Sequence, residues 1–387
     1  MRSTSDIHVG GAVRVTTFPG VARIDVQHLG ALVPEALRDP ELDKPRRKIW
    51  TAQHNDALLD ALTAAAVGNG GSFNSFAEWT TMCGAAYDFA DINTKRRARF
   101  SGPYRAAITT VFGMERSVGL AARIQATAFI PAKGVDFECR AWRPRALYET
   151  EFMALAPAVT VCFGGAQQVF LSGVMDWDEA HRPQNTADVR AQIRSVLQRI
   201  IAVFEEAGGS RNDVLRLRPM LPMPAYARVL QEEVAALWPE ALRPICTVWA
   251  GLPMPAGTCA EIQAYGMIGD QRATVCHEPI TAAVGMTARV ARARDFAMVL
   301  AGPFGALSKS VQETTGHIAD FMQSQRLGAQ DVCTALVQVR DEETERACIS
   351  ATKDVLDPNC LHVIRVRPEE GLSGDVIHVE LTARQCG

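Results

Sequence analysis

Cys360 and His362 stand two positions apart in the segment CLHVIRV, whose β-branched residues predict a strand. Alternate residues of a strand point to the same face, so we expect the thiol and the imidazole to be neighbours. A neighbouring His favours the thiolate, and a glutamate such as Glu380 can orient the His. The alternative is a buried Cys beside a half-exposed structural His, because Cys is among the most buried residue types.

Arg243, Cys246 and Glu261 form a second set, in the segments RPICTV and AEIQAYGM. A guanidinium binds a carboxylate through two parallel hydrogen bonds, and a glutamate can activate water or move protons. The alternative is an ion pair between Arg243 and Glu261 at the rim of a sheet, which would add little to stability. The elements around these residues decide between the two interpretations.

These elements recur three times along the chain. The middle copy is the clearest: QQVFLSG predicts a strand that ends in a turn, and Ile193, Leu197, Ile200 and Phe204 form one apolar helical stripe. Gly208 and Gly209 end that helix. A strand (DVLRLRPML), a second amphipathic helix (AYARVLQEEVAALW) and two closing strands complete the unit.

The first copy matches the middle one at a shift of 138 residues, and the third at a shift of 119. These shifts place Gly71 on Gly209, Arg123 on Glu261, and Glu261 on Glu380. The same order of elements in three copies predicts three tandem α+β domains over 1–135, 136–270 and 271–387. Each would be a mixed sheet covered by two helices on one face, so the other face must be buried on a neighbour.

Composition narrows the class of protein. The 387 residues are 48% hydrophobic and 21% charged, with a net charge of −3, which is ordinary for a globular protein. Without a basic block or an apolar run of spanning length, we expect neither nucleic acid nor membrane as a partner. The first residues lack an apolar signal segment, so we expect a cytoplasmic protein with free thiols. The ten cysteines contain no CxxC pair, so we expect no metal.

The middle copy resembles the Rid/YjgF (reactive intermediate deaminase) family over about 120 residues, from VFLSGVMDWD through RPICTV and AGLP to AEIQAYGM. The resemblance is weaker in the other two copies, but the three together cover nearly the whole chain. It implies an intramolecular pseudo-trimer with the chorismate-mutase-like fold, sheets inward and helices outward. It also implies three non-identical clefts where neighbouring domains meet.

The resemblance further implies hydrolysis of imines or enamines without a cofactor, with an arginine holding the substrate carboxylate and a glutamate handling water or protons. The glutamate carries over to Glu261 and Glu380, whereas the first copy has Arg123 there. RPICTV is one residue short of the family motif, so Arg243 is either the displaced clamp or a non-catalytic arginine. In the third copy the motif places Cys360 at the clamp position, and the ungapped repeat alignment places His362 opposite Arg243.

We therefore expect an enzyme that hydrolyses, tautomerises or cyclises a carboxylated imine, enamine or similar intermediate, in specialised metabolism. A non-catalytic protein that binds a small acid is one alternative, and a chorismatase-like lyase or hydrolase is another. The expected partner is a small carboxylated substrate. The expected assembly is a monomeric pseudo-trimer or a low-order homo-oligomer.

Overall fold

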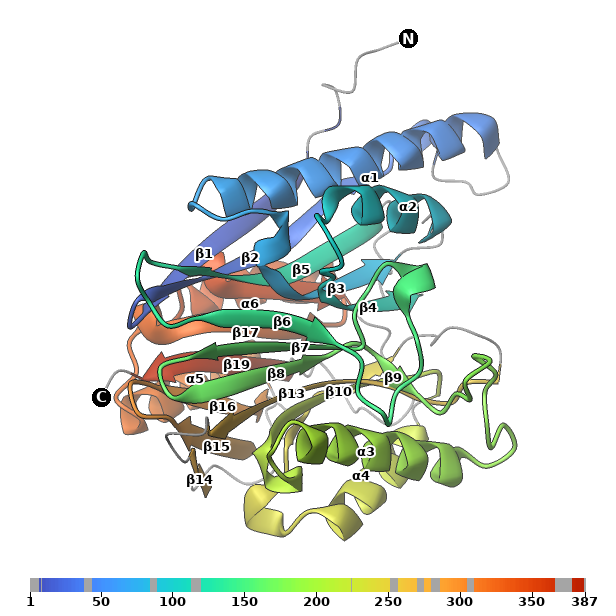
Figure 1. Ribbon diagram of the computed structural model, residues 1–387. Coiled ribbons are helices and arrows are strands. Elements are labelled where there is room, and N and C mark those ends of the chain that lie inside the picture. The colour runs from blue at the N-terminus through green and yellow to red at the C-terminus, as the bar shows by residue number, and fades with distance from the viewer. Residues whose placement is uncertain are drawn as a thin grey trace.

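The computed structural model describes residues 7, 9–37, 44–83, 89–112, 120–223, 225–250, 257–269, 275–279, 286–304, 310–365 and 378–385. These residues form three mixed β-sheets, each accompanied by two α-helices. Figure 1 shows the sheets in the interior, with α1 and α2 on one outer side and α3 and α4 on the opposite one. The predicted class, three tandem α+β domains, is confirmed.

Domain 1 contains a five-stranded sheet in the order β1-β2-β5-β3-β4. Its strands are β1 (Gly10–Phe18), β2 (Val21–Leu32), β3 (Phe76–Cys83), β4 (Ala107–Phe112) and β5 (Leu120–Pro131). Its helices are α1 (Lys44–Val67) and α2 (Phe89–Arg99). The charged sequence of the segment around 35–50 predicts an exposed insertion, but its last residues belong to the start of α1.

Domain 2 contains the largest sheet, in the order β11-β10-β13-β8-β7-β6, with β12 beside β10 and β9 beside β13. Its strands are β6 (Glu138–Trp142), β7 (Ala158–Phe163), β8 (Ala166–Leu171), β9 (Val174–Met175), β10 (Val214–Leu221), β11 (Ile245–Cys246), β12 (Trp249–Ala250) and β13 (Glu261–Gly269). Its helices are α3 (Val189–Glu206) and α4 (Tyr226–Leu237).

Domain 3 contains a six-stranded sheet in the order β14-β15-β16-β19-β17-β18. Its strands are β14 (Cys276–Pro279), β15 (Thr287–Arg292), β16 (Ala297–Phe304), β17 (Val332–Val339), β18 (Leu361–Arg365) and β19 (His378–Gln385). Its helices are α5 (Val311–Ser324) and α6 (Glu342–Thr352).

Local sequence signals explain the helix that the sequence predicts best, α3. Asp188 caps its first turn by accepting a hydrogen bond from the amide of Ala191. The expected apolar stripe, from Ile193 to Phe204, is buried against the sheet of domain 2. The helix ends at Glu206, and two residues later Gly208 has a φ of +91°, a conformation that glycine adopts without strain.

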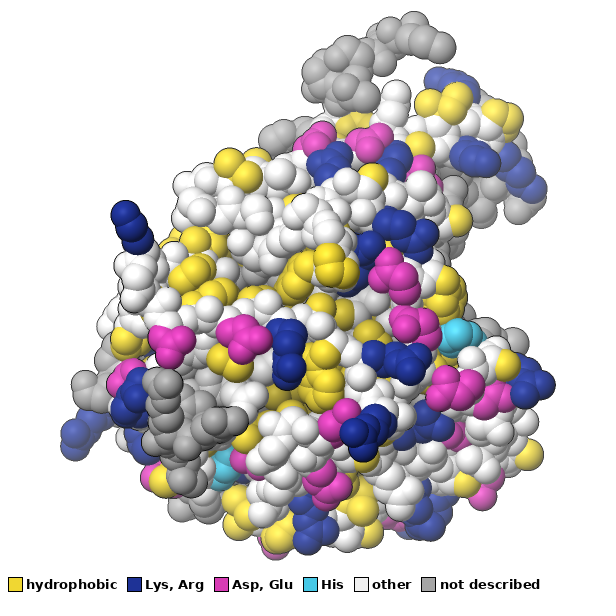
Figure 2. All heavy atoms as spheres, viewed as in Figure 1, with side chains coloured by type: hydrophobic (Ala, Val, Ile, Leu, Met, Phe, Trp, Pro, Cys, Tyr) yellow, Lys and Arg dark blue, Asp and Glu magenta, His cyan; other side chains and the backbone are white. Residues whose placement is uncertain are grey.

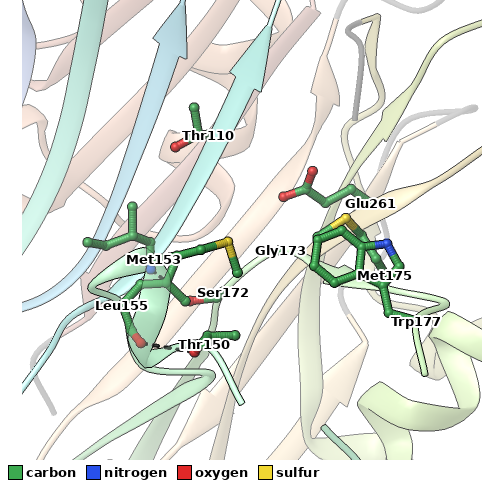
Figure 3. A pocket seen from close by; sticks show the side chains of 10 residues that line it. Thr110, Thr150, Met153, Leu155, Ser172, Gly173, Met175, Trp177 and Glu261 are labelled. Atoms are coloured by element: carbon green, nitrogen blue, oxygen red, sulfur yellow. Dashed lines mark hydrogen bonds between the residues drawn. The ribbon is translucent and has the colours of Figure 1, made fainter. Parts of the chain in front are cut away.

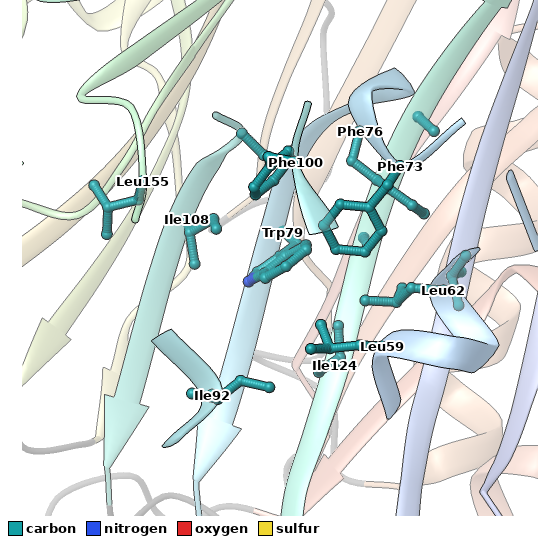
Figure 4. Close-up of a cluster of buried hydrophobic side chains, with 14 of the residues drawn as sticks. Leu59, Leu62, Phe73, Phe76, Trp79, Ile92, Phe100, Ile108, Ile124 and Leu155 are labelled. Atoms are coloured by element: carbon teal, nitrogen blue, oxygen red, sulfur yellow. The ribbon is translucent and has the colours of Figure 1, made fainter. Parts of the chain in front are cut away.

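Between the helices and the sheet, each domain has its own hydrophobic core. In domain 1 the rings of Phe73, Phe76, Trp79 and Phe100 pack edge to face or stacked, with centroids 4.7–6.4 Å apart. Figure 4 shows this ring cluster beside Ile108 of β4 and Leu155 of the segment that leads into domain 2. The core of domain 1 therefore extends to the boundary between the two domains.

Strand register confirms the expected correspondence between domains 1 and 2. Met82 lies opposite Arg123 and Met220 lies opposite Glu261, as the shift of 138 requires. Arg123 and Glu261 therefore occupy equivalent positions on β5 and β13.

In domain 3 the register corrects the expected shift of 119. Strands β10 and β17 both begin directly after a 3-10 turn, η5 (Arg211–Asp213) and η7 (Ala329–Asp331), so Gln338 is the counterpart of Met220. Gln338 lies opposite His378. His378 is therefore the counterpart of Glu261, and Glu380 is the counterpart of Gln263. The intervening segments of domain 3 are shorter, so an ungapped alignment slips.

Where the three sheets meet, their inner faces bury a polar layer. Gln263 of domain 2 donates a hydrogen bond to Thr80 of domain 1 over 3.0 Å. Arg218 of domain 2 donates to Glu380 of domain 3 over 2.7 Å and to Gln125 of domain 1 over 3.3 Å. All five side chains are buried, so this layer connects the three domains.

An apolar layer lies next to the polar one and draws two residues from each domain: Met82, Val111, Met220, Trp249, Leu336 and Ile364. This contribution from all three domains is what a pseudo-trimer requires. None of the helices within the described ranges has the length and hydropathy needed to cross a bilayer.

We predict that Arg218→Met lowers the free energy of unfolding by about 3–5 kcal/mol, because it leaves the buried carboxylate of Glu380 without its main partner. The double variant Arg218→Met/Glu380→Leu should recover most of this loss. Urea denaturation of the whole chain would measure both effects.

Arg228→Gln is the matched control, because it removes an ion pair with Glu232 whose arginine side chain is 86% exposed. That variant should change the free energy of unfolding by less than about 1 kcal/mol. Equal losses in Arg218→Met and Arg228→Gln would show that the buried pair does not hold the domains together.

Candidate functional site

Glu261 is the first residue of β13, between Met220 of β10 and Met175 of β9. Its side chain is buried, with the residue only 5% exposed. Figure 3 shows its carboxylate pointing away from domain 2, toward Thr110 on β4 of domain 1. The side chain therefore reaches the seam between these two domains.

A small cavity of about 30 Å³ lies in front of this carboxylate. Its walls come from both domains and from the segment that joins them, and most of them are apolar. The lining residues are Ile108, Thr110, Thr150, Met153, Leu155, Ser172, Gly173, Met175, Trp177 and Glu261. This volume is about that of one water molecule, so a larger ligand requires lining side chains to move. The thioether side chains of Met153 and Met175 adapt most readily.

The segment between β6 and β7 builds one wall of the cavity. Its 3-10 turn η4 (Glu151–Met153) is anchored to domain 1, because Arg97 of α2 donates hydrogen bonds to the carbonyls of Glu151 and Phe152 over 2.6 and 3.0 Å. Arg105 forms an ion pair with the Glu151 carboxylate at 2.9 Å. The linker is therefore a fixed part of the site.

Ser172 fixes the next part of the wall. Its hydroxyl accepts a hydrogen bond from the amide of Ile108 over 2.8 Å and donates one to the carbonyl of Ala156 over 2.6 Å. Because Ile108 belongs to β4, this one side chain sets the spacing between domain 1 and domain 2 beside the cavity.

Gly173 leaves the space that the Glu261 carboxylate occupies. A Cβ atom on Gly173 would lie 1.8 Å from Glu261 Oε1 and 2.6 Å from its carboxyl carbon. The glycine is therefore required by close approach of a side chain, and any other residue would displace the carboxylate.

Burial controls the protonation of Glu261. Removal from water raises the pKa of its carboxyl to about 8, since no compensating cation or hydrogen-bond donor to it is found among the described residues. The group is then predominantly protonated at neutral pH. Tyr148 is nearby, and the pKa of its hydroxyl is raised by burial and by the charge of Glu261.

Arg243 lies far from Glu261. It follows the 3-10 turn η6 (Glu240–Leu242), which contacts β14 of domain 3. Met220 of β10 pairs with Glu261 on one side and with Trp249 on the other. Trp249 is six residues after Arg243, which corresponds to roughly 20 Å of extended chain at about 3.3 Å per residue. The structure therefore does not bring the predicted arginine and glutamate into one cleft.

Cys246 of β11 packs against the core of domain 2, and burial raises the pKa of its thiol to about 12, with a further contribution from the charge of Glu380. A thiol with this pKa remains protonated at neutral pH. Nothing in this environment activates it as a nucleophile.

The expected neighbours Cys360 and His362 point in different directions. Cys360 ends a 3-10 turn, η8 (Pro358–Cys360), and packs in the core of domain 3, where burial raises its pKa to about 12. His362 is the second residue of β18 and alternates with the core residues Leu361 and Val363. The rule that alternate strand residues share a face fails because Cys360 is outside the strand.

Glu380 belongs to the polar layer between the sheets. Burial alone would raise the pKa of its carboxyl, but Arg218 and Arg216 outweigh this effect and hold it below its usual value. The residue is 1% exposed. The ion pair of Glu380 with Arg218 is a structural contact between domains 2 and 3.

At the two other seams, the positions equivalent to Glu261 are occupied by Arg123 and His378. Arg123 donates a hydrogen bond to the carbonyl of Val363 on β18 of domain 3. Beside His378, Gln338 donates a hydrogen bond to the carbonyl of Val248 in domain 2 over 3.1 Å. The three seams are thus non-identical, and the seam between domains 1 and 2 contains the cavity with a glutamate.

Sequence reasoning did not identify Tyr148, Ser172, Gly173 or Trp177 as site residues. The Ser-Gly pair was interpreted only as a turn, and Trp177 stands in VFLSGVMDWD, a segment that carried the family resemblance. Among the described residues no group of three or more His, Cys, Asp or Glu side chains is arranged to hold a metal ion.

These features define a class: a three-domain α+β protein whose candidate site lies at a seam between domains. No protein-family model and no curated protein matches the chain. Similar solved structures include a chorismatase, with a TM-score of 0.44 and 13% identity over 66% of this chain and 80% of that one.

Two further similar structures are RidA from an Antarctic Psychrobacter species and a putative endoribonuclease L-PSP from Entamoeba histolytica. The first has a TM-score of 0.26 and 29% identity, and the match covers 29% of this chain and 87% of the RidA chain. The second has a TM-score of 0.30 and 20% identity, and it covers 34% of this chain and 100% of its own. The resemblance to Rid/YjgF proteins expected from the sequence is thus found again among solved structures.

We predict that Glu261→Gln stabilises the chain, and more so at high pH. A carboxyl whose pKa rises from 4.5 to about 8 on folding costs stability as pH increases through that interval. The full cost is roughly 5 kcal/mol above pH 8, of which about 3 kcal/mol appears between pH 6 and 9. Urea denaturation of both proteins at these two pH values measures the difference, and a difference independent of pH would contradict the assigned environment.

Gly173→Ala tests the close approach. The new methyl group should push the Glu261 carboxylate out of place and move its pKa back toward the ordinary value. Carbon-13 NMR titration of labelled glutamate, with Glu261→Gln to assign the signal, would show this. Gly316→Ala is the control, because a Cβ there meets no atom within 4 Å in helix α5, and it should leave the titration unchanged.

Proposed function

We propose that the chain is a cofactor-independent enzyme that transfers protons to and from a small imine or enamine in the seam between domains 1 and 2, with Glu261 as the acid and base. The observation that carries the proposal is the Glu261 carboxyl itself. It is buried, faces a cavity at a domain boundary, and has a pKa of about 8. Such a group exchanges protons readily near neutral pH.

The chemistry balances with one carboxyl and one water molecule. Protonated Glu261 delivers its proton to the β-carbon of an enamine, which becomes an iminium ion. The Glu261 carboxylate then takes a proton from water as the water oxygen bonds to the iminium carbon. Collapse of the resulting aminoalcohol, after proton transfer to nitrogen, releases ammonia and leaves the ketone. An imine substrate follows the same course from its protonation at nitrogen.

The surroundings of Glu261 suit this role. The apolar walls keep bulk water away from the carboxyl and hold it neutral until substrate arrives. Thr110 lies on the opposite side of the cavity, where its hydroxyl can contact a bound polar group (Figure 3). Arg243, Cys246, Cys360, His362 and Glu380 do not line this cavity and take no part in the proposal.

We predict that Glu261→Gln reduces release of ammonia from imines and enamines generated in solution by at least about a hundredfold, the contribution expected of a general acid and base. Acid-first catalysis requires the protonated form, so kcat/KM should fall as pH rises through about 8. A coupled assay for ammonia, run from pH 6 to 9, measures both effects.

Glu343→Gln, at an exposed position of α6, is the control and should keep full activity. Turnover of chorismate in the same panel would instead support a lyase or hydrolase of the chorismatase type. Tight binding of a small acid that is recovered unchanged, with no turnover of any substrate, would support a binding protein and would overturn the proposal.

A further inference from the structure

A second and larger hollow lies on the outer side of the site. It has a volume of about 550 Å³ and lies between helix α3 and the segment that joins β6 to β7. We call it the outer cleft; its lining includes Arg145, Tyr148, Trp177, Asp178, Glu179 and Arg199.

The outer cleft and the Glu261 cavity share a wall. Trp177 lines both of them. A void of about 10 Å³ continues the path, because its lining joins Tyr148 of the outer cleft to Ser172 and Gly173 of the cavity. The rings of Tyr148 and Trp177 pack with centroids 4.9 Å apart. Two aromatic side chains therefore separate an open cleft from an enclosed acid.

Two arginines in the cleft have guanidinium N–H groups that are not fully used in hydrogen bonds. Arg199 makes a weak hydrogen bond of 3.3 Å to the carbonyl of Ala146 and lies 3.8 Å from Asp176. Asp176 already accepts shorter hydrogen bonds from Ser195 and Asn185, at 2.6 and 2.8 Å. Arg199 therefore retains hydrogen-bonding capacity toward the cleft.

The side chain of Arg145 has no hydrogen bond or ion pair among the described residues, where only its backbone amide is engaged. Of the two acidic residues in the lining, Asp178 forms an ion pair with Arg182 at 2.7 Å, and Glu179 is exposed without an ion pair among the described residues. Figure 2 shows basic and acidic side chains next to one another on this face, over α3 and the segment beside it. Two arginines, Arg145 and Arg199, thus face the cleft against one unpaired glutamate, so its net charge is positive.

From these observations we infer that the outer cleft is the anion subsite of the enzyme, in which Arg145 and Arg199 bind the carboxylate of the substrate. The reactive end of that substrate then passes the Tyr148 and Trp177 rings and reaches Glu261. The inference rests on the proposed function only for this reactive end. It assigns to Arg145 and Arg199 the clamping role that the sequence had suggested for Arg243.

The assignment selects a class of substrate. The anionic group and the reacting atom must be separated by the aromatic wall, so a carboxylate attached directly to the imine carbon is too short to reach both. A longer or planar acid, with an apolar middle against Trp177, satisfies both ends. Flat π systems also pack favourably on aromatic rings.

Benzoate and its uncharged amide, benzamide, are matched probes of the subsite. We expect benzoate to bind the unaltered chain at least about fivefold more tightly than benzamide, with NMR line broadening and titration calorimetry as the readouts. Arg145→Gln and Arg199→Gln should each remove most of this advantage, weakening benzoate severalfold and leaving benzamide unchanged. Arg145→Gln is the sharper variant, because this side chain makes no hydrogen bond or ion pair among the described residues.

Arg228→Gln, on the exposed side of α4, removes the same charge elsewhere and should leave benzoate binding intact. Equal affinity for the two probes, or equal loss in all three variants, would overturn the inference. Binding is measured without turnover. The benzoate test can therefore support the anion subsite even if Glu261→Gln shows that the proposed chemistry is wrong. The converse outcome is activity that depends on Glu261, with an affinity for benzoate that is unchanged in both arginine variants. That result would support the proposed function and contradict the subsite.

Discussion

The structure depends on the burial of polar groups between three sheets. Each sheet has helices on one face only, so its other face must find a partner. The partner is supplied by the other two domains, through Arg218 to Glu380 and Gln125, and through Gln263 to Thr80. Charges taken out of water are tolerated only when they meet one another with good geometry. The relative position of the domains is therefore fixed by a few directional contacts.

That constraint also determines where a ligand can bind. Two residues along the closing strands from Gln125, Gln263 and Glu380 lie Arg123, Glu261 and His378, each at a seam. Arg123 is satisfied by a carbonyl of the neighbouring domain, while Glu261 faces an unfilled space. Equivalent positions of the same backbone framework thus form a contact between domains at Arg123 and a candidate site at Glu261.

The fold was largely predictable and the site was not. The stripe from Ile193 to Phe204 and the repeated order of elements are local signals, so three domains could be predicted from the sequence alone. The pairing of Cys360 with His362 depended on where a strand begins, and a 3-10 turn moved that boundary by one residue. The cavity walls join residues as distant as Thr110 and Glu261, and no single-sequence pattern reports such contacts. Glu261 was identified by resemblance, but its separation from Arg243 required the register.

The peptide between the first two domains is more than a tether, since it supplies Thr150, Met153 and Leu155 to the wall of the site. Three identical subunits joined only by symmetry would have to carry every substitution three times. In a single chain, the sequence of one linker can change at one domain interface while the other two interfaces remain structural. A single chain with three unlike domains can therefore change the walls of the candidate site without changing the framework that surrounds it.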